Sequence, residues 1–214
     1  MIKFILFDLD GTLTDPKEGI TKCVKYALSH FGIERDVDSL TEFIGPPLKE
    51  QFMKYASLSE EDGVRAVEIY RERFAPIGKF ENKVYDGVVP MLKKLKESGK
   101  TIAVATSKPH IFANQIIEKF ELSPYIDALF GSELDGTNTD KALVIKEAMA
   151  SMGAKESETV MIGDRVHDAI GAEKNNIPFI GVKYGYAKEG ELEKSNAIKI
   201  AASPEELSGI LLSL

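Results

Sequence analysis

Five short runs of apolar, largely β-branched residues recur along this chain without the strict alternation of a half-exposed strand. Such runs are typical of strands that are buried on both faces of a parallel sheet. Helical patterns lie between them; in VVPMLKKLKESG, for example, the apolar residues recur at helical spacing. Strand and helix alternate from about residue 84 onward, which predicts a doubly wound α/β core. The five runs are KFILFD (3–8), TIAVATS (101–107), TVMIGD (159–164), PFIGVKY (178–184) and IKIAAS (198–203).

Several residues predict where the helices of this core begin and end. Pro109 suits the first position of a helix. Thr139 suits the N-cap of a helix over 140–152, and Gly153 suits its end. In SPEE, Ser203 is expected to cap the last helix, in a capping box with Glu206.

Residues 16–80 depart from this alternation, because they contain helical patterns and no convincing strand. The first strand is therefore expected to be followed by a helical insertion. The natural crossings are TDP (14–16) and FENKVYDG (80–87). This organisation predicts a core domain formed by residues 1–15 and 81–214, with a smaller helical domain over 16–80.

Composition excludes several classes of protein. The formal net charge is −7 and the pI is near 5.2, whereas a nucleic-acid-binding surface is usually basic. The single cysteine, Cys23, excludes an internal disulfide and fits a reducing compartment. The apolar start, residues 2–7, is far too short to span a membrane. A protein of the cytoplasm is expected, with no membrane and no nucleic-acid polymer among its partners.

Acidic residues follow two of the predicted strands. Asp8 and Asp10 of DLDGT end the first run, and Gly11 permits a sharp turn there. Asp164 of GDRVHD ends the third run, with Asp168 about one helical turn later. If these strands are neighbours, the carboxylates crowd together, and two like charges about 4 Å apart cost roughly 4 kcal/mol at a dielectric near 20. A hard divalent cation relieves that repulsion, and all-oxygen ligands favour Mg²⁺.

Two further places suit an anion. Thr106 and Ser107 offer hydroxyl groups beside exposed amides at the end of the second run, which suits an anion. Taken alone, these two residues are better explained as a helix cap before Pro109. Lys141 lies early in a predicted helix, where the helix dipole favours acidic residues. That misfit indicates an anion nearby, with a solvated surface lysine as the alternative.

Together these segments resemble the haloacid dehalogenase superfamily of phosphotransferases over nearly the whole chain. The family's pattern consists of DxDGT after the first strand of its core, Thr/Ser after the second, a lysine at a later helix start and GDxxxD after the fourth strand of that core. Within the superfamily, the chain most resembles the phosphoglycolate phosphatase-like branch. The segments that carry this likeness are IGPPL, VYDGV, TSKP, GSELDG and GDRVHD.

The resemblance implies a Rossmann-like core with a small α-helical cap inserted after strand one. Asp8 would attack phosphorus and form an aspartyl-phosphate, while Asp10 would protonate the leaving alcohol and activate water. Mg²⁺ would bind the Asp8 carboxylate, the Asp10 backbone carbonyl and Asp164, with Asp168 supporting it indirectly. The phosphoryl oxygens would be held by Thr106, Lys141 and neighbouring amides such as that of Ser107. A cap loop containing Gly45 would help to choose the substrate.

The function expected from this resemblance is hydrolysis of a small phosphorylated metabolite by a Mg²⁺-dependent phosphatase, with phosphoglycolate as one candidate. The alternatives are a 5'-nucleotidase acting on nucleoside monophosphates, a sugar-phosphate mutase and a non-catalytic binding module. Dehalogenation is not expected, because family dehalogenases lack an Asp at the position of Asp10. The sequence leaves monomer and dimer open.

Overall fold

The computed structural model describes all residues, 1–214, and the chain separates into two compact units. The core unit consists of Met1–Asp15 and Val84–Leu214, and the inserted unit is Pro16–Lys83. Strands β2 (Thr14–Asp15) and β3 (Lys83–Val84) form a separate two-stranded sheet where the chain passes between the units.

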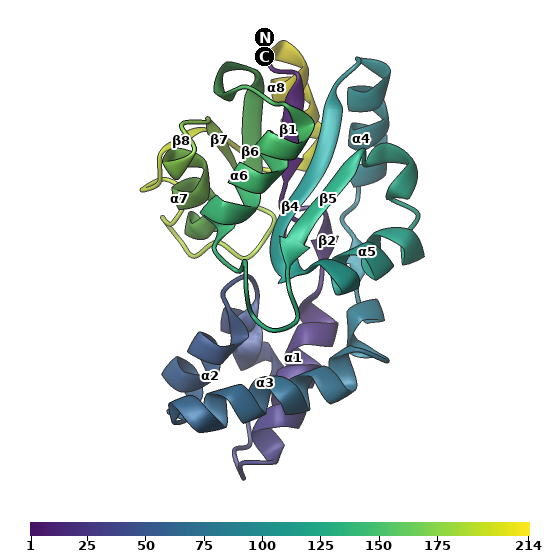
Figure 1. The fold of residues 1–214 in the computed structure, drawn as a ribbon. Coiled ribbons are helices and arrows are strands. Elements are labelled where there is room, and N and C mark those ends of the chain that lie inside the picture. The colour runs from purple at the N-terminus through teal and green to yellow at the C-terminus, as the bar shows by residue number, and fades with distance from the viewer. The chain divides into compact units, whose positions relative to one another are not determined.

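The core unit is built on a six-stranded sheet in the order β5-β4-β1-β6-β7-β8 (Figure 1). Every pairing in it is parallel, and β1 lies between β4 and β6. Residues that follow β1, β4 and β6 therefore emerge side by side at the carboxyl end of the sheet. The strands are β1 (Phe4–Phe7), β4 (Thr101–Pro109), β5 (Ala128–Ser132), β6 (Thr159–Gly163), β7 (Phe179–Val182) and β8 (Ala197–Ala201).

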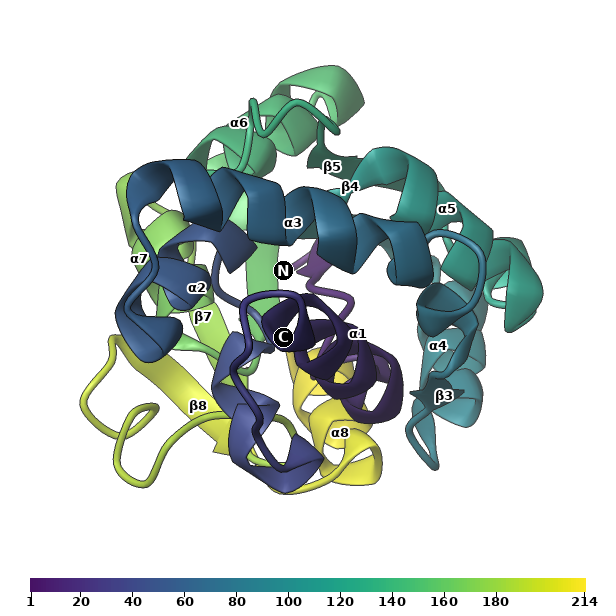
Figure 2. The ribbon, with the colours of Figure 1, turned by 90° about the horizontal axis from the view of Figure 1, so that it is seen from below.

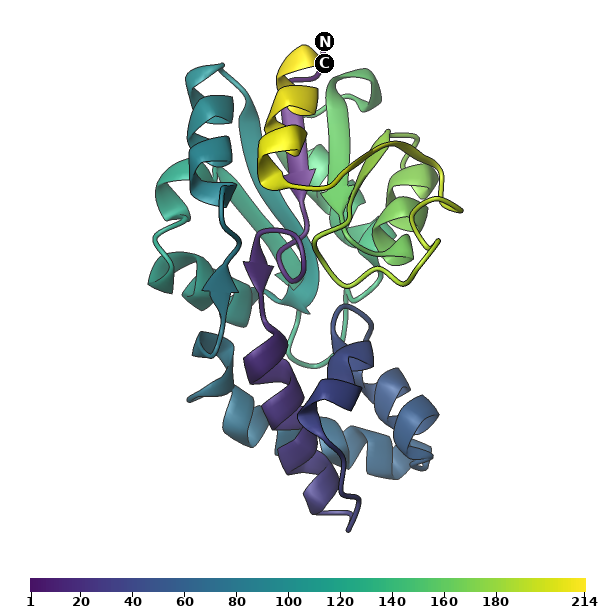
Figure 3. The same cartoon turned by 180° about the vertical axis from the view of Figure 1, so that it is seen from behind.

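Helices cover both faces of this sheet, so the predicted doubly wound arrangement is confirmed (Figures 1 and 3). Ile5 and Phe7 of β1 pack in one core cluster with residues of α4, α5 and α8. Leu6 points to the opposite face and packs with residues of α6 and α7. These helices are α4 (Val88–Glu97), α5 (His110–Lys119), α6 (Lys141–Met152), α7 (Val166–Lys174) and α8 (Pro204–Ser213). Short 3₁₀ turns occur at Ser123–Tyr125 and Glu156–Glu158.

Strand β5 is absent from the five sequence predictions. It lies at an edge of the sheet, and four of its five residues are only partly buried. Its sequence, ALFGS, also contains Ala and Gly, which are depleted in strands. An apolar run therefore did not mark it.

Two predicted helix starts are wrong by one residue. Strand β4 extends through Pro109, which pairs with Ser132, so Pro109 precedes the first residue of α5 instead of occupying it. The N-cap of α6 is Asp140, whose carboxylate accepts a hydrogen bond from the amide of Ala142 at 2.8 Å, and not Thr139. Gly153 does end α6, with φ of +62°.

The predicted cap of α8 is confirmed, since Ser203 accepts a hydrogen bond from the amide of Glu206 at 3.2 Å. The Glu206 carboxylate, however, accepts from the amide of Ala202 at 2.7 Å, so the capping box is displaced by one residue.

The inserted unit is helical, as its sequence predicts, and Figure 2 shows its three α-helices. An aromatic contact between Phe43 and Phe52, with ring centroids 5.0 Å apart, forms part of its interior. Arg73 and Glu81 form an ion pair at 2.6 Å. The helices are α1 (Lys17–Ser29), α2 (Leu48–Ala56) and α3 (Glu60–Phe74), with 3₁₀ turns at Val37–Phe43 and Gly78–Phe80. None of the helices in either unit has the length and apolar character needed to cross a membrane.

The α6 cap is open to a direct test. Asp140→Ala is expected to lower the free energy of unfolding by about 1 kcal/mol, because the first turn of α6 loses its acceptor. Thr139→Ala is the matched control and should change it by less than about 0.5 kcal/mol. Urea unfolding followed by circular dichroism measures both, and equal losses would contradict the assignment of Asp140 as the cap.

Candidate active site

Four aspartates meet at the carboxyl end of the core sheet. Asp8 and Asp10 follow β1, Asp164 follows β6, and Asp168 lies in the first turn of α7. All four are buried, with Asp10 the most exposed at 8%. Carboxylate oxygens of Asp8, Asp164 and Asp168 all lie within 4.8 Å of one another. We refer to these four residues as the acidic cluster.

The turn after β1 is shaped to let these groups approach. Gly11 has φ of +82°, in the region that favours glycine, and a Cβ there would overlap the carboxylate of Asp164. Gly163, at the end of β6, is confined in the same way by Asp168. A side chain at either position would push the carboxylates apart.

Two buried lysines balance part of the charge. Lys141, the first residue of α6, places Nζ 2.8 Å from Asp8 Oδ1 and 2.9 Å from Asp168 Oδ1. Its Nζ also donates to the carbonyl of Ala105 at 3.0 Å. Lys141 is only 6% exposed, so it is not a solvated surface lysine. The two carboxylates that it faces explain why a cation is found at the start of this helix.

Lys108 is a residue that the sequence analysis did not assign to the site. Its ammonium group is ion-paired and hydrogen-bonded with Asp10 Oδ2. A signal was present: the lysine follows Thr106 and Ser107 at the end of a buried strand, where a cation can face the acidic residues of the neighbouring strand. Four carboxylates thus meet two lysines, which leaves two negative charges uncompensated when all are ionised.

Burial makes ionisation of Asp10, Asp164 and Asp168 unfavourable. Burial raises the pKa of Asp164 well above its usual range, and the charges of Asp168 and Asp8 raise it further. Burial raises the pKa of Asp168 to about 6, although Lys141 opposes the shift. Burial also raises the pKa of Asp10 against the influence of Lys108. For Lys141, burial alone would lower the pKa, but Asp168 and Asp8 outweigh it and raise the value.

The donor set fits a hard divalent cation. Asp8, Asp164 and Asp168 each offer a carboxylate oxygen, and oxygen ligands are the ones that hard cations such as Mg²⁺ prefer. A dication would offset the two uncompensated charges and compete with the protons that burial favours. The residues present therefore match such an ion in charge and in chemistry.

The remaining predicted residues lie as follows. Thr106 is buried near the end of β4, and its Oγ1 accepts from the amide of Lys108 at 3.3 Å. Ser107 is partly buried, and its carbonyl accepts from the hydroxyl of Ser132 at 2.8 Å. Gly45 belongs to the inserted unit and precedes α2, with φ of +101°. The expected roles of these residues in binding phosphate or substrate stay predictions.

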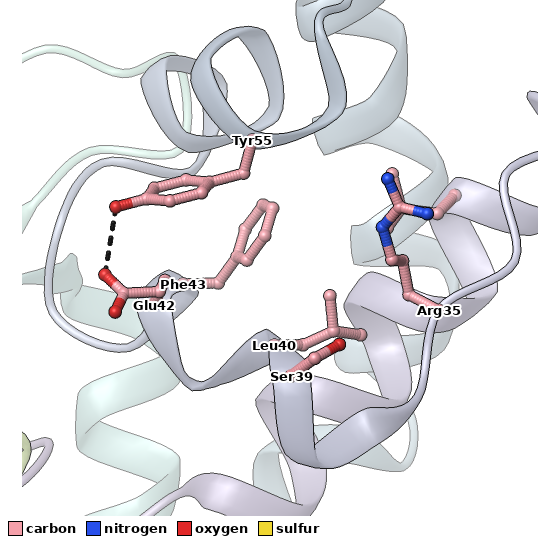
Figure 4. A pocket seen from close by; sticks show the side chains of 7 residues that line it. Arg35, Ser39, Leu40, Glu42, Phe43 and Tyr55 are labelled. Carbon is pink, nitrogen blue, oxygen red and sulfur yellow. Dashed lines mark hydrogen bonds between the residues drawn. The ribbon is translucent and has the colours of Figure 1, made fainter.

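A pocket within the inserted unit offers a different environment (Figure 4). Its volume is about 160 Å³, well below the roughly 300–1,000 Å³ of typical small-molecule sites. Tyr55 donates to Glu42 at 2.9 Å beside it. Its lining has one carboxylate, so it cannot form an acidic cation site. The lining residues are Leu28, Arg35, Ser39, Leu40, Glu42, Phe43 and Tyr55.

Comparison with known proteins gives a family match and several relatives. A family model described as haloacid dehalogenase-like hydrolase matches residues 5–182. A 5'-nucleotidase of Pseudomonas aeruginosa is 45% identical over 210 residues, which cover 98% of this chain and 95% of that protein. The tyrosine-protein kinase PtkA of Mycobacterium tuberculosis is 33% identical over 208 residues, 96% of this chain and 71% of that protein.

A phosphoglycolate phosphatase of Vibrio parahaemolyticus is 27% identical over 215 residues, 96% of this chain and 94% of that protein. Among solved structures, that of a predicted phosphatase from Clostridium acetobutylicum superposes with a TM-score of 0.97. It is 49% identical and covers all of both chains.

Asp164→Asn should separate the effect of the acidic cluster on stability from its ability to bind a cation. Without metal at pH 7.5, the variant is expected to melt at the wild-type temperature or higher, by about 2–4 °C per kcal/mol of relieved repulsion. Added MgCl₂ should raise the melting temperature of the wild type and not that of the variant. Asp62→Asn, on α3, is the control and should respond to MgCl₂ as the wild type does. Equal responses in all three proteins would contradict a cation site at Asp164.

The raised pKa of Asp168 predicts a pH dependence in the metal-free protein. Its carboxyl titrates at about 6 when folded and near 3.8 when unfolded. It therefore contributes stability below pH 4, and that contribution is lost as the pH rises through 6. The loss is on the order of 3 kcal/mol, at about 1.4 kcal/mol per pKa unit. Urea unfolding in chelator gives the difference in free energy between wild type and Asp168→Asn, which should fall across this window; a pH-independent difference would contradict the assignment.

Proposed function

The chain belongs to the haloacid dehalogenase-like hydrolase family, and from that premise we propose that it hydrolyses a small phosphate monoester with the help of Mg²⁺. The observation that carries this proposal is the acidic cluster, in which Asp8 and Asp10 share one buried site with Asp164, Asp168 and Lys141. Phosphoryl transfer depends on positioning and charge stabilisation, and this set of groups can supply both.

Asp8 is the nucleophile in this proposal. Its carboxylate oxygen bonds to phosphorus while the bond from phosphorus to the ester oxygen breaks, giving an aspartyl-phosphate. Lys141, in contact with Asp8 Oδ1 at 2.8 Å, keeps the carboxylate oriented and offsets the charge of the phosphoryl oxygens. Thr106 and the amide of Ser107 would hold those oxygens at the end of β4.

Asp10 moves the proton in both steps. Its Oδ2 is paired with Lys108, and its Oδ1 is buried and unpartnered, so Oδ1 is the atom available to the substrate. The raised pKa of Asp10 favours the protonated form that the first step needs. Asp10 gives this proton to the leaving alcohol. It then takes a proton from the water that attacks phosphorus and breaks the bond to Asp8.

Mg²⁺ would be held by the carboxylates of Asp8 and Asp164 and the backbone carbonyl of Asp10, with Asp168 beside them. When bound, the ion supplies positive charge that stabilises the transferring phosphoryl group. Lys141 spans Asp8 and Asp168, so it orders these two carboxylates relative to each other.

Two substrate classes follow from the relatives. Nucleoside monophosphates are placed first, because the relative described as a 5'-nucleotidase is 45% identical over nearly the whole chain. Phosphoglycolate is second, since the phosphoglycolate phosphatase relative is 27% identical. We propose that the inserted unit, with Gly45 in the loop before α2, acts as a cap that selects between such esters.

The test is phosphate release from a panel of nucleoside monophosphates, phosphoglycolate and sugar phosphates, with MgCl₂ or chelator. Asp8→Asn is expected to lower kcat by about 10⁴-fold or more, as loss of a nucleophile does. Asp10→Asn should lower kcat by about 10²–10⁴-fold, the usual contribution of a general acid–base. Asp62→Asn should keep wild-type kcat.

The panel also separates the alternatives. Release that survives both Asp8→Asn and chelation would overturn the proposal. Interconversion of sugar phosphates with little phosphate release would indicate a mutase, and no turnover of any ester would indicate a binding module. The ranking of kcat/KM between nucleoside monophosphates and phosphoglycolate decides which ester class is preferred.

A further inference from the structure

The segment Lys183–Glu191, called here the 183–191 loop, contacts the acidic cluster although the proposed chemistry does not use it. It follows β7 and precedes β8, and it consists of turns without a helix or strand. Its sequence, KYGYAKEGE, places a tyrosine on each side of Gly185. No motif of the sequence analysis singled out its middle, because the apolar run before it ends at Tyr184.

The backbone of this loop lies directly against Asp164. The amide of Tyr186 donates to Asp164 Oδ2 at 2.7 Å. A Cβ on Gly185 would overlap both the Asp164 side chain and the carbonyl oxygen of Gly11, so only glycine permits this approach. The other oxygen, Oδ1, faces the hydroxyl of Thr12 at the long distance of 3.5 Å. The amide of Tyr186 therefore donates the shorter of these two hydrogen bonds, and it orients the Asp164 carboxylate.

The two tyrosines fasten the loop to the segment after β1. The Tyr186 hydroxyl donates to Asp15 Oδ1, and the Tyr184 hydroxyl donates to the carbonyl of Thr12 at 3.1 Å. Burial raises the pKa of Tyr186, and Asp15 adds to the shift, so the hydroxyl stays protonated and donates at neutral pH. Asp15 is the last residue of the core unit before the chain enters the inserted unit.

The far end of the loop holds the residues that follow Asp164. Glu191 accepts from the side chain of Arg165 at 3.0 Å and from the amide of Val166 at 2.8 Å. The 183–191 loop thus contacts Asp164 itself and the two residues after it. One loop restrains both the carboxylate and the backbone that carries it.

We propose that the 183–191 loop is a clamp that holds Asp164 in the orientation that binds the cation, with the Tyr186 hydroxyl on Asp15 as its anchor. The inference rests on the proposed function, in which Asp164 is a ligand. Tyr186 is a positioning residue, since its side chain acts on Asp164 through its own backbone amide. Partners that orient metal ligands in this way typically contribute 10–100-fold to affinity.

A purely structural role for Tyr186 makes a different prediction. Loss of its hydroxyl would then lower the melting temperature and leave the affinity of the folded protein for the cation unchanged. A clamp predicts a loss of affinity in protein that remains folded. It also predicts that Asp15 and Tyr186 act as a pair, so that removing the second partner adds little once the first is gone.

The test is titration of the full chain with Mn²⁺, monitored through the electron paramagnetic resonance signal of the free ion. Melting temperatures are measured separately, in chelator. Tyr186→Phe and Asp15→Ala should each raise the Kd for Mn²⁺ about tenfold, the lower end of the range for such partners. The double variant should be no weaker than either single one. Asp15→Asn keeps an acceptor oxygen for the tyrosine and should keep wild-type affinity. Tyr55→Phe, which removes the bond to Glu42 in the inserted unit, is the matched control.

Each outcome decides the matter. An unchanged Kd in folded Tyr186→Phe overturns the clamp and leaves the proposed function intact. If Tyr186→Phe does not fold, Asp15→Ala removes the same bond from the other side and is judged by the same criterion. A wild type that binds no Mn²⁺, or an Asp164→Asn variant that binds it as well as the wild type, overturns the proposed cation site and the clamp with it.

Discussion

The four carboxylates of the acidic cluster repel one another in a buried space, and the structure around them is arranged to offset that repulsion. Lys141 lies between Asp8 and Asp168, and Lys108 pairs with Asp10. Two lysines for four carboxylates leave the cluster short of positive charge. Burial is the main cause that raises the pKa values of Asp164, Asp168 and Asp10. The same excess of negative charge suits the cluster to a divalent cation, whose positive charge would offset it.

The order of the sheet makes this concentration of charge possible. Because β1 lies between β4 and β6, the ends of these three strands place their residues side by side at the carboxyl end of the sheet. These residues are Asp8 and Asp10, the Thr106–Lys108 segment and Asp164. Glycine at 11 and 163 removes the side chains that would hold the carboxylates apart. The helices pack on both faces of the sheet, so the carboxyl ends of the strands are lined by loops. One of them is the 183–191 loop, which contacts Asp164 through the amide of Tyr186.

Much of this follows from sequence, because it depends on features that are local. Apolar runs identify the central strands, and carboxylates at their ends meet once those strands are neighbours. What sequence did not reveal depends on contacts at a distance. Nothing in TSKP says that the long side chain of Lys108 turns toward Asp10, and the contact made by Tyr186 uses a backbone amide, which has no residue-specific signal. Strand β5 was missed because it is a half-buried edge strand. The predicted starts of α6 and α5 were each wrong by one residue, because Asp140 is the N-cap of α6 in place of Thr139 and because β4 continues to Pro109.

The most direct test of Asp8 as the nucleophile is the mass of the protein after a reaction is quenched with acid. The substrate is an ester that has a good leaving group, such as p-nitrophenyl phosphate. In Asp10→Asn, attack by Asp8 can still proceed, because such a leaving group needs no proton. Hydrolysis of the aspartyl-phosphate lacks the carboxylate that takes a proton from water, so this intermediate should accumulate. We predict that Asp10→Asn gains the mass of one phosphoryl group, on the peptide that contains Asp8, and that Asp8→Asn gains none. A phosphoryl group found on another residue, or turnover by the wild type with no adduct in Asp10→Asn, would contradict Asp8 as the nucleophile.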